Sequence, residues 1–119
     1  MTPYNYTLTI GYNPSTTIGL IEGVPYSVST STDSYLMLQF TASVTGYYEI
    51  ITKRTSGDPM FFLFDSNGYL ITSDDDSGGN LNARLYGDLE IAKTYYIAVQ
   101  GYNGNAATFT ITISLEEEI

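Results

Sequence analysis

Short segments in which apolar and polar residues alternate recur along this sequence, and they restrict it to folds built from β-strands. In the last such segment, Phe109, Ile111, Ile113 and Leu115 alternate with Thr and Ser residues. Successive side chains of a strand point to opposite faces, so this spacing gives one apolar face and one hydroxyl-bearing face. A strand with two such faces is half-buried, as in a sheet that packs on one side against a core.

The same period of two marks the segments 34–43 and 47–55. Their inward positions are Leu36, Leu38, Phe40 and Ala42 in the first, and Tyr48 and Ile50 in the second. The run Met60–Phe64 is instead apolar at both parities, which is typical of a central strand covered on both faces. The Asn-Gly dipeptide that follows predicts a type I′ hairpin turn over Asp65–Gly68.

Turn-forming residues occur about every 8 to 15 residues along the chain, as β-sandwiches require. The predicted strands are 4–10, 25–30, 34–43, 47–55, 60–64, 69–73, 83–86, 94–101 and 108–115. Twelve Tyr residues and abundant Thr favour strands over helices. We predict one all-β domain over residues 1–115, an antiparallel, jelly-roll-like β-sandwich of about eight or nine strands. The run Glu116–Glu118 predicts a solvated acidic tail over residues 116–119.

Charge and residue content exclude several classes of function. The chain has 13 acidic and four basic residues, and its formal net charge of −9 repels phosphate backbones and anionic membranes. It has no Cys and no His, which excludes disulfides, thiol nucleophiles, catalytic imidazole and the usual zinc, haem and copper sites. No apolar run approaches the roughly 18 residues of a membrane span. The carboxylates show no spacing that singles out a glycosidase-type pair, so we predict that the chain is not an enzyme.

Three adjacent carboxylates, Asp74, Asp75 and Asp76, precede two glycines and are the sharpest local feature of the sequence. Calcium takes about six to eight oxygen ligands, which clustered carboxylates and nearby backbone carbonyls supply. Asn80 and Asp65 would add ligands if the fold brings them close. The alternative is a solvated acidic turn whose side chains bond to local backbone amides. The sequence leaves both interpretations open.

The number of tyrosines points to a surface role for some of them. Twelve are more than the core of a domain of this size accommodates. We expect Tyr47, Tyr96 and Tyr102, which lie opposite inward positions, to line a binding surface. Exposed aromatic rings bind extended sugar or peptide polymers through a large contact area at low entropic cost. The alternative for each tyrosine is a structural role, since Tyr is a good strand residue.

From Ser34 onward the chain carries a recognisable order of segments. An apolar strand leads into Gly46–Ile50, and the segments Asp58–Gly68, Ser73–Gly79 and Thr94–Val99 precede a Thr-rich last strand. This order resembles the bacterial pre-peptidase C-terminal domain family, which is related to the collagen-binding domains of clostridial collagenases. The resemblance implies a non-catalytic β-sandwich appended to secreted bacterial enzymes, commonly proteases, and thus a secreted or cell-surface location.

The resemblance also bears on calcium. Collagen-binding relatives bind calcium through acids that precede the first strands, together with acids in a nearby loop. Here residues 1–32 contain a single acid, Glu22, so the first half of such a site has no counterpart. The loop half would correspond to Asp74, Asp75 and Asp76. The resemblance does not imply collagen as the ligand.

Two functions fit these features. The first is a monomeric, non-catalytic extracellular module that targets or anchors a secreted bacterial protein to an insoluble polymer, protein or polysaccharide, with calcium stiffening the acidic loop. Its partner would be that polymer or a neighbouring domain of a secreted enzyme. The alternative is a self-assembling structural subunit of a surface layer or extracellular fibre, in which the strand 107–115 or 4–10 pairs with a neighbouring copy. Both strands equally fit pairing within their own sandwich.

Overall fold

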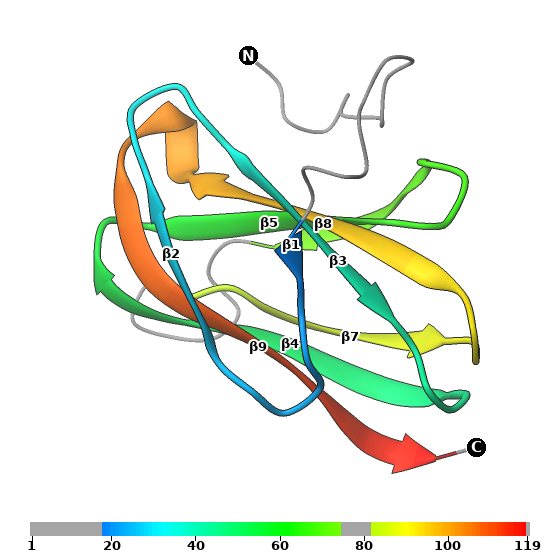
Figure 1. Ribbon diagram of the computed structural model, residues 1–119. Coiled ribbons are helices and arrows are strands. Elements are labelled where there is room, and N and C mark those ends of the chain that lie inside the picture. Colours follow the sequence, from blue (N-terminus) through cyan, green and yellow to red (C-terminus); the bar gives the residue numbers. More distant parts are fainter. Residues whose placement is uncertain (1–17, 75–81, 119) are drawn as a thin grey trace.

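Nine strands in two sheets make up the part of the chain that the structure, a computed structural model, describes, residues 18–74 and 82–118 (Figure 1). The strands are β1 (Ile18–Gly19), β2 (Tyr26–Thr30), β3 (Leu36–Thr41), β4 (Gly46–Ser56), β5 (Pro59–Phe64), β6 (Leu70–Asp74), β7 (Arg84–Leu89), β8 (Thr94–Gly101) and β9 (Ala107–Glu118). A 3₁₀ turn, η3 (Tyr102–Gly104), lies between β8 and β9. The predicted first strand, 4–10, falls outside the described residues. In the described part of the chain, no helix is long and apolar enough to span a membrane.

The strand order is that of a jelly roll. One sheet has the order β1-β3-β8-β5-β6 and the other β2-β9-β4-β7. From β2 to β9 all neighbours are antiparallel, and the chain changes sheet after every strand except β5. The predicted all-β, jelly-roll-like sandwich is therefore confirmed. β1 departs from the prediction because it pairs in parallel with β3, and its two residues are too few for an alternating pattern to reveal a strand.

β9 occupies the interior of the four-stranded sheet, between β2 and β4. The hypothesis that 107–115 adds to a neighbouring copy is therefore wrong, because both edges of this strand are already paired. β9 also runs further than predicted, since Glu117 and Glu118 pair with Tyr47 and Gly46 at the start of β4. The glutamates expected in a tail thus belong to the strand, with exposed side chains.

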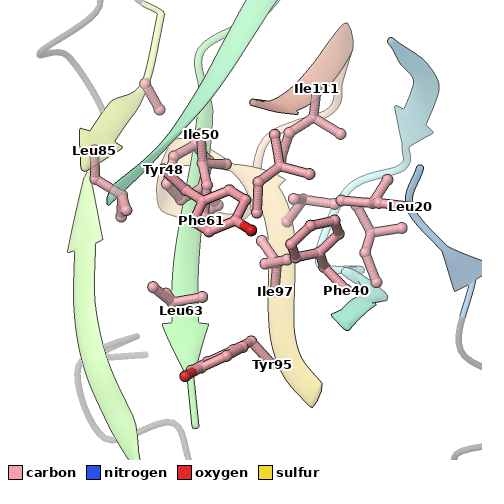
Figure 2. Close-up of a cluster of buried hydrophobic side chains, with 14 of the residues drawn as sticks. Leu20, Phe40, Tyr48, Ile50, Phe61, Leu63, Leu85, Tyr95, Ile97 and Ile111 are labelled. Atoms are coloured by element: carbon pink, nitrogen blue, oxygen red, sulfur yellow. The ribbon is translucent and has the colours of Figure 1, made fainter. Parts of the chain in front are cut away.

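The main core fills the space between the two sheets, as the alternating pattern predicts (Figure 2). Its members include Phe40 of β3, Tyr48 and Ile50 of β4, Phe61 of β5 and Ile111 of β9, all buried. Burial of an apolar side chain of this size contributes about 1.5 to 3 kcal/mol relative to exposure. The two packed sheets thereby fix which side chains face outward.

β5 is buried on both faces, as predicted for Met60–Phe64. Phe61 and Leu63 belong to the core between the sheets, whereas Phe62 and Phe64 form a second cluster with Met60 and Ala98. The sequence could not assign these faces, because both parities are apolar. Residues of three other strands of the same sheet, Met37, Leu70 and Tyr96, pack against the second cluster.

The hairpin between β5 and β6 forms where the sequence predicts it, but its turn is of another type. A type I′ turn over Asp65–Gly68 needs a positive φ at both central residues, Ser66 and Asn67, and neither has one, whereas Gly68, the last residue of the turn, has a φ of 86°. Asp65 accounts for the difference. Its Oδ1 accepts hydrogen bonds of 2.9 and 3.0 Å from the amides of Asn67 and Tyr69, and this side-chain bonding stabilises the observed turn.

Candidate functional site

The outer face of the four-stranded sheet carries the candidate site. Apolar residues of its strands point into the core, so the intervening residues point outward. On β2 and β9 these are hydroxyl-bearing residues: Ser27, Ser29, Thr108, Thr110, Thr112 and Ser114. The hydroxyl oxygens of Ser29 and Thr108 lie 3.4 Å apart across the two strands. One half of this face is therefore a layer of short hydroxyl side chains.

The other half, on β4 and β7, is aromatic and charged. The rings of Tyr47 and Tyr86 stack with 5.3 Å between their centroids and 6° between their planes. Glu49 lies directly opposite Tyr86, so the two tyrosines are diagonal neighbours across the strands. The Arg84 guanidinium carbon lies 5.7 Å from the Tyr86 ring centroid, within range of a cation–π contact. We call Arg84, Tyr86 and Tyr47 the tyrosine column.

Glu49 orients the tyrosine column. Its Oε2 accepts a 3.2 Å hydrogen bond from the Tyr86 hydroxyl and lies 3.9 Å from an Arg84 guanidinium nitrogen. Partial burial raises the pKa of Tyr86 above its ordinary value, and the hydrogen bond to Glu49 and the negative charge of that carboxylate act in the same direction. The hydroxyl therefore stays protonated and donating at neutral pH. The Glu49–Arg84 ion pair adds little stability because water screens it.

Tyr47 stands between two acidic residues. Its cross-strand partners are Asp88 on β7 and Glu117 on β9, and directly paired residues share one face of a sheet. A bulge in the β4–β9 pairing adds Glu116 nearby, and its charge contributes to the raised pKa of Tyr86. Tyr47 and Tyr86 remain 39% and 41% exposed. This end of the sheet face is thus both aromatic and acidic.

The structure separates the three tyrosines that the sequence predicts on one surface. Tyr47 lies on the outer face of the four-stranded sheet, whereas Tyr96, on β8 of the other sheet, packs partly buried against the second cluster. Tyr102 is exposed in η3, where its amide donates a 2.7 Å hydrogen bond to the Asp58 carbonyl. The partner of Tyr47 is Tyr86, which the sequence analysis did not single out. Tyr86 follows the inward-facing Leu85, so strand alternation indicated that the Tyr86 side chain points outward. Nothing in the sequence indicated that the strand of Tyr86 pairs with β4.

Of the predicted calcium ligands, the structure describes Asp65, whose Oδ1 accepts hydrogen bonds from the amides of its own turn, and Asp74. Asp74 ends β6, and its Oδ2 accepts a 2.8 Å hydrogen bond from the Arg84 amide. Arg84 begins β7, so this bond joins two strands and is not the local turn bonding of the alternative interpretation. Asp75, Asp76 and Asn80 lie outside the described residues. Within residues 18–74 and 82–118, no three acidic side chains gather as a metal site, and calcium binding stays a prediction.

Comparison with known proteins supports the fold. No family model matches the sequence, and no curated protein matches it. The pre-peptidase C-terminal domain of a collagenase from Bacillus anthracis has a TM-score of 0.58 at 13% identity, over 82% of this chain and 91% of that one. PliG from Aeromonas hydrophila, a periplasmic inhibitor of g-type lysozyme, has a TM-score of 0.62 at 16% identity, over 85% and 96%. PliG from Salmonella Typhimurium has a TM-score of 0.53 at 16% identity, over 84% and 98%. The resemblance to the pre-peptidase C-terminal domain is therefore confirmed as a shared fold.

Proposed function

We propose that the chain is a non-catalytic extracellular module that holds a secreted bacterial protein on an insoluble polymer, and that the outer face of the four-stranded sheet makes the contact. The observation that carries this proposal is the stacked pair Tyr47–Tyr86 beside rows of Thr and Ser hydroxyls. Stacking and the hydrogen bond to Glu49 order the rings before any ligand binds. Preordered side chains lose little conformational entropy on binding, so such a face suits weak, repeated contacts with a polymer.

The shared fold supports a binding role. It is found in the pre-peptidase C-terminal domain of a collagenase and in PliG, a protein that inhibits an enzyme. The periplasmic location of PliG and the attachment of the other domain to a collagenase agree with an envelope or extracellular location for this chain. The position of Tyr47 on β4, a long strand that is paired on both sides, supports a surface held rigid by the sandwich.

Cosedimentation with collagen, chitin, cellulose and peptidoglycan tests this function. We expect the protein to pellet with one of these polymers and to lose that binding in the double variant Tyr47→Ser/Tyr86→Ser. Tyr69→Ser is the matched control, because Tyr69 is 67% exposed and borders the other sheet. Protein that stays in solution with all four polymers contradicts the proposal. So does a double variant that pellets as well as the unaltered chain.

Each polymer is tested with calcium and with a chelator. If the acidic loop Asp74–Asp76 binds calcium and stiffens the module, the chelator weakens pelleting and lowers the melting temperature. The variant Asp75→Asn/Asp76→Asn should then respond less to calcium than the unaltered chain. Equal pelleting and equal melting temperatures in both conditions would assign the loop to the acidic-turn alternative.

Two other functions are tested alongside, the first of them by the same pelleting assay. A structural subunit would pellet without any polymer, in an amount that rises with protein concentration. In the described part of the chain, the strands at sheet edges are β1, β6, β2 and β7, so self-assembly by strand addition would have to use these strands rather than β9. Because two solved proteins of this fold inhibit g-type lysozyme, a lysozyme activity assay completes the set.

A further inference from the structure

We propose that the Tyr47 end of the tyrosine column receives an arginine side chain from a basic segment of a partner protein. The proposal rests on the proposed function, because it uses the same sheet face, and it names the chemistry of the partner. It follows from a difference in charge between the two ends of the column: one end holds the guanidinium of Arg84, and the other is flanked by carboxylates.

At the first end, the chain already contains a complete arginine site. The Arg84 guanidinium lies 5.7 Å from the centroid of the Tyr86 ring, and Glu49 stands 3.9 Å from the same guanidinium. The ring attracts the cation through its quadrupole, and the carboxylate balances the charge. On this exposed face, the cation–π contact with Tyr86 and the ion pair with Glu49 together balance the positive charge of Arg84.

At the second end, the described residues place the ring and the carboxylates together, and no ion pair within residues 18–74 and 82–118 involves them. Tyr47 is 39% exposed beyond its stack on Tyr86, and its cross-strand partners are Asp88 and Glu117. Glu116 adjoins Glu117 at the bulge in β9, and its negative charge acts on Tyr86, the ring on which Tyr47 stacks. Two carboxylates beside an aromatic ring reproduce the surroundings of Arg84, with more negative charge.

The basic residues of the chain do not neutralise this end. Arg84 is paired with Glu49, and Lys93 is 3.0 Å from Glu90. Lys53 and Arg54 lie six and seven positions further along β4 than Tyr47, which corresponds to roughly 20 Å of strand. The charge at the Tyr47 end therefore favours a cation that comes from another molecule.

Arginine fits this end better than lysine does. A guanidinium is planar, stacks on an aromatic ring and donates to two carboxylate oxygens at once, whereas an ammonium is a strongly hydrated point charge. The net charge of −9 on the chain also attracts a basic protein segment, and this electrostatic attraction raises the rate of association. Anionic polymers such as nucleic acids are repelled by the same charge.

Fluorescence anisotropy with the full chain and labelled hexa-arginine, hexa-lysine and hexa-citrulline peptides tests the proposal. Citrulline keeps the shape of arginine without its charge. We expect hexa-arginine to bind most tightly and hexa-citrulline not to bind. Tyr47→Ser should weaken hexa-arginine binding about two- to thirtyfold, the range that a cation–π contact implies, whereas Tyr47→Phe should keep most of the affinity. Tyr69→Ser should bind as the unaltered chain does.

A pair of charge-matched variants separates the site from general electrostatic attraction. Asp88→Asn and Asp33→Asn each remove one negative charge, but Asp33 follows β2 at the end of the sandwich opposite Tyr47. This placement follows from the pairing of Thr30 and Ser56 with adjacent residues at the start of β9. We expect Asp88→Asn to weaken binding and Asp33→Asn to leave it nearly unchanged. Equal weakening by both variants, or unchanged binding by Tyr47→Ser, would overturn the proposal.

The two proposals fail separately. Tyrosine-dependent pelleting with a polymer, combined with equal affinity for hexa-arginine and hexa-citrulline, overturns the arginine site and leaves the proposed function standing. Tyr47-dependent binding of hexa-arginine without pelleting on any polymer supports the arginine site and contradicts the proposed function.

Discussion

The Asp74 carboxylate accepts a hydrogen bond from the Arg84 backbone amide, with 2.8 Å between Oδ2 and the nitrogen. Asp74 ends β6 at the edge of one sheet, and Arg84 begins β7 at the edge of the other. The bond therefore ties the two sheets together along one side of the sandwich. It also holds the backbone of the residue whose side chain begins the tyrosine column.

Replacement of Asp74 tests the contribution of this bond. We expect Asp74→Ala to lower the free energy of unfolding by about 1 to 2 kcal/mol, since a hydrogen bond to a carboxylate is lost at a partly buried site. Asp74→Asn keeps an acceptor oxygen and should cost less. Urea unfolding of the three proteins measures both values. An Asp74→Ala variant as stable as the unaltered chain would mean that the two edges are held without this contact.

Because β5 is buried on both faces, we expect substitutions on either face to lower the free energy of unfolding by similar amounts. Phe61 and Phe62 are both 0% exposed, one in the core between the sheets and one in the second cluster. Each change to Ala should destabilise the fold by about 3 to 5 kcal/mol, because it leaves a cavity in a packed environment. Tyr69→Ala, at an exposed position, should change stability by less than about 0.5 kcal/mol. A mild effect of Phe62→Ala would show that the second cluster is loosely packed.

Two strand glycines should respond in opposite ways to the same substitution. A Cβ added at Gly87 would lie 3.8 Å from Leu63 Cδ2, an ordinary contact, whereas one added at Gly101 would clash with the Asn105 carbonyl oxygen. Gly87→Ala should therefore stabilise the fold by about 0.4 to 1 kcal/mol, because it restricts the unfolded chain. Gly101→Ala should destabilise it, since the clash is with backbone. Thermal unfolding compares the two variants, and a stable Gly101→Ala protein would be inconsistent with the close approach of η3 to β8.

The buried Tyr48 links stability to alkaline pH. Burial raises its pKa above 10, although its hydrogen bond to the Val44 carbonyl (2.7 Å) acts in the opposite direction. The unfolded chain, whose pKa is lower, therefore loses this proton first as the pH rises. Stability should be complete below about pH 10 and should fall above it. Tyr48→Phe should show a shallower decline in unfolding free energy between neutral and strongly alkaline pH, and an equally steep decline would contradict this assignment.

Side-chain direction was predictable along the alternating strands but not along β5, which is apolar at both parities. Alternation along 34–43 and 108–115 identifies the buried residues correctly because parity is a local property of an extended backbone. The turn at Asp65–Gly68 was predictable in place but not in type. Its geometry depends on two hydrogen bonds to the Asp65 carboxylate, which the preference of Asn-Gly for a type I′ turn does not reveal.

A sandwich of short strands, the buried faces of its alternating strands, and an acidic surface rich in tyrosine all follow from local sequence patterns. The tertiary structure decided which surface tyrosines meet. Tyr47 and Tyr86 stack, and Tyr47 and Tyr96 lie on opposite sheets, because the jelly-roll order pairs β4 with β7 and assigns β8 to the other sheet. It also decided that β9 is an interior strand. Strand order and register depend on contacts between segments far apart in the chain, and an alternating pattern, which is identical for every register of the same parity, does not encode them.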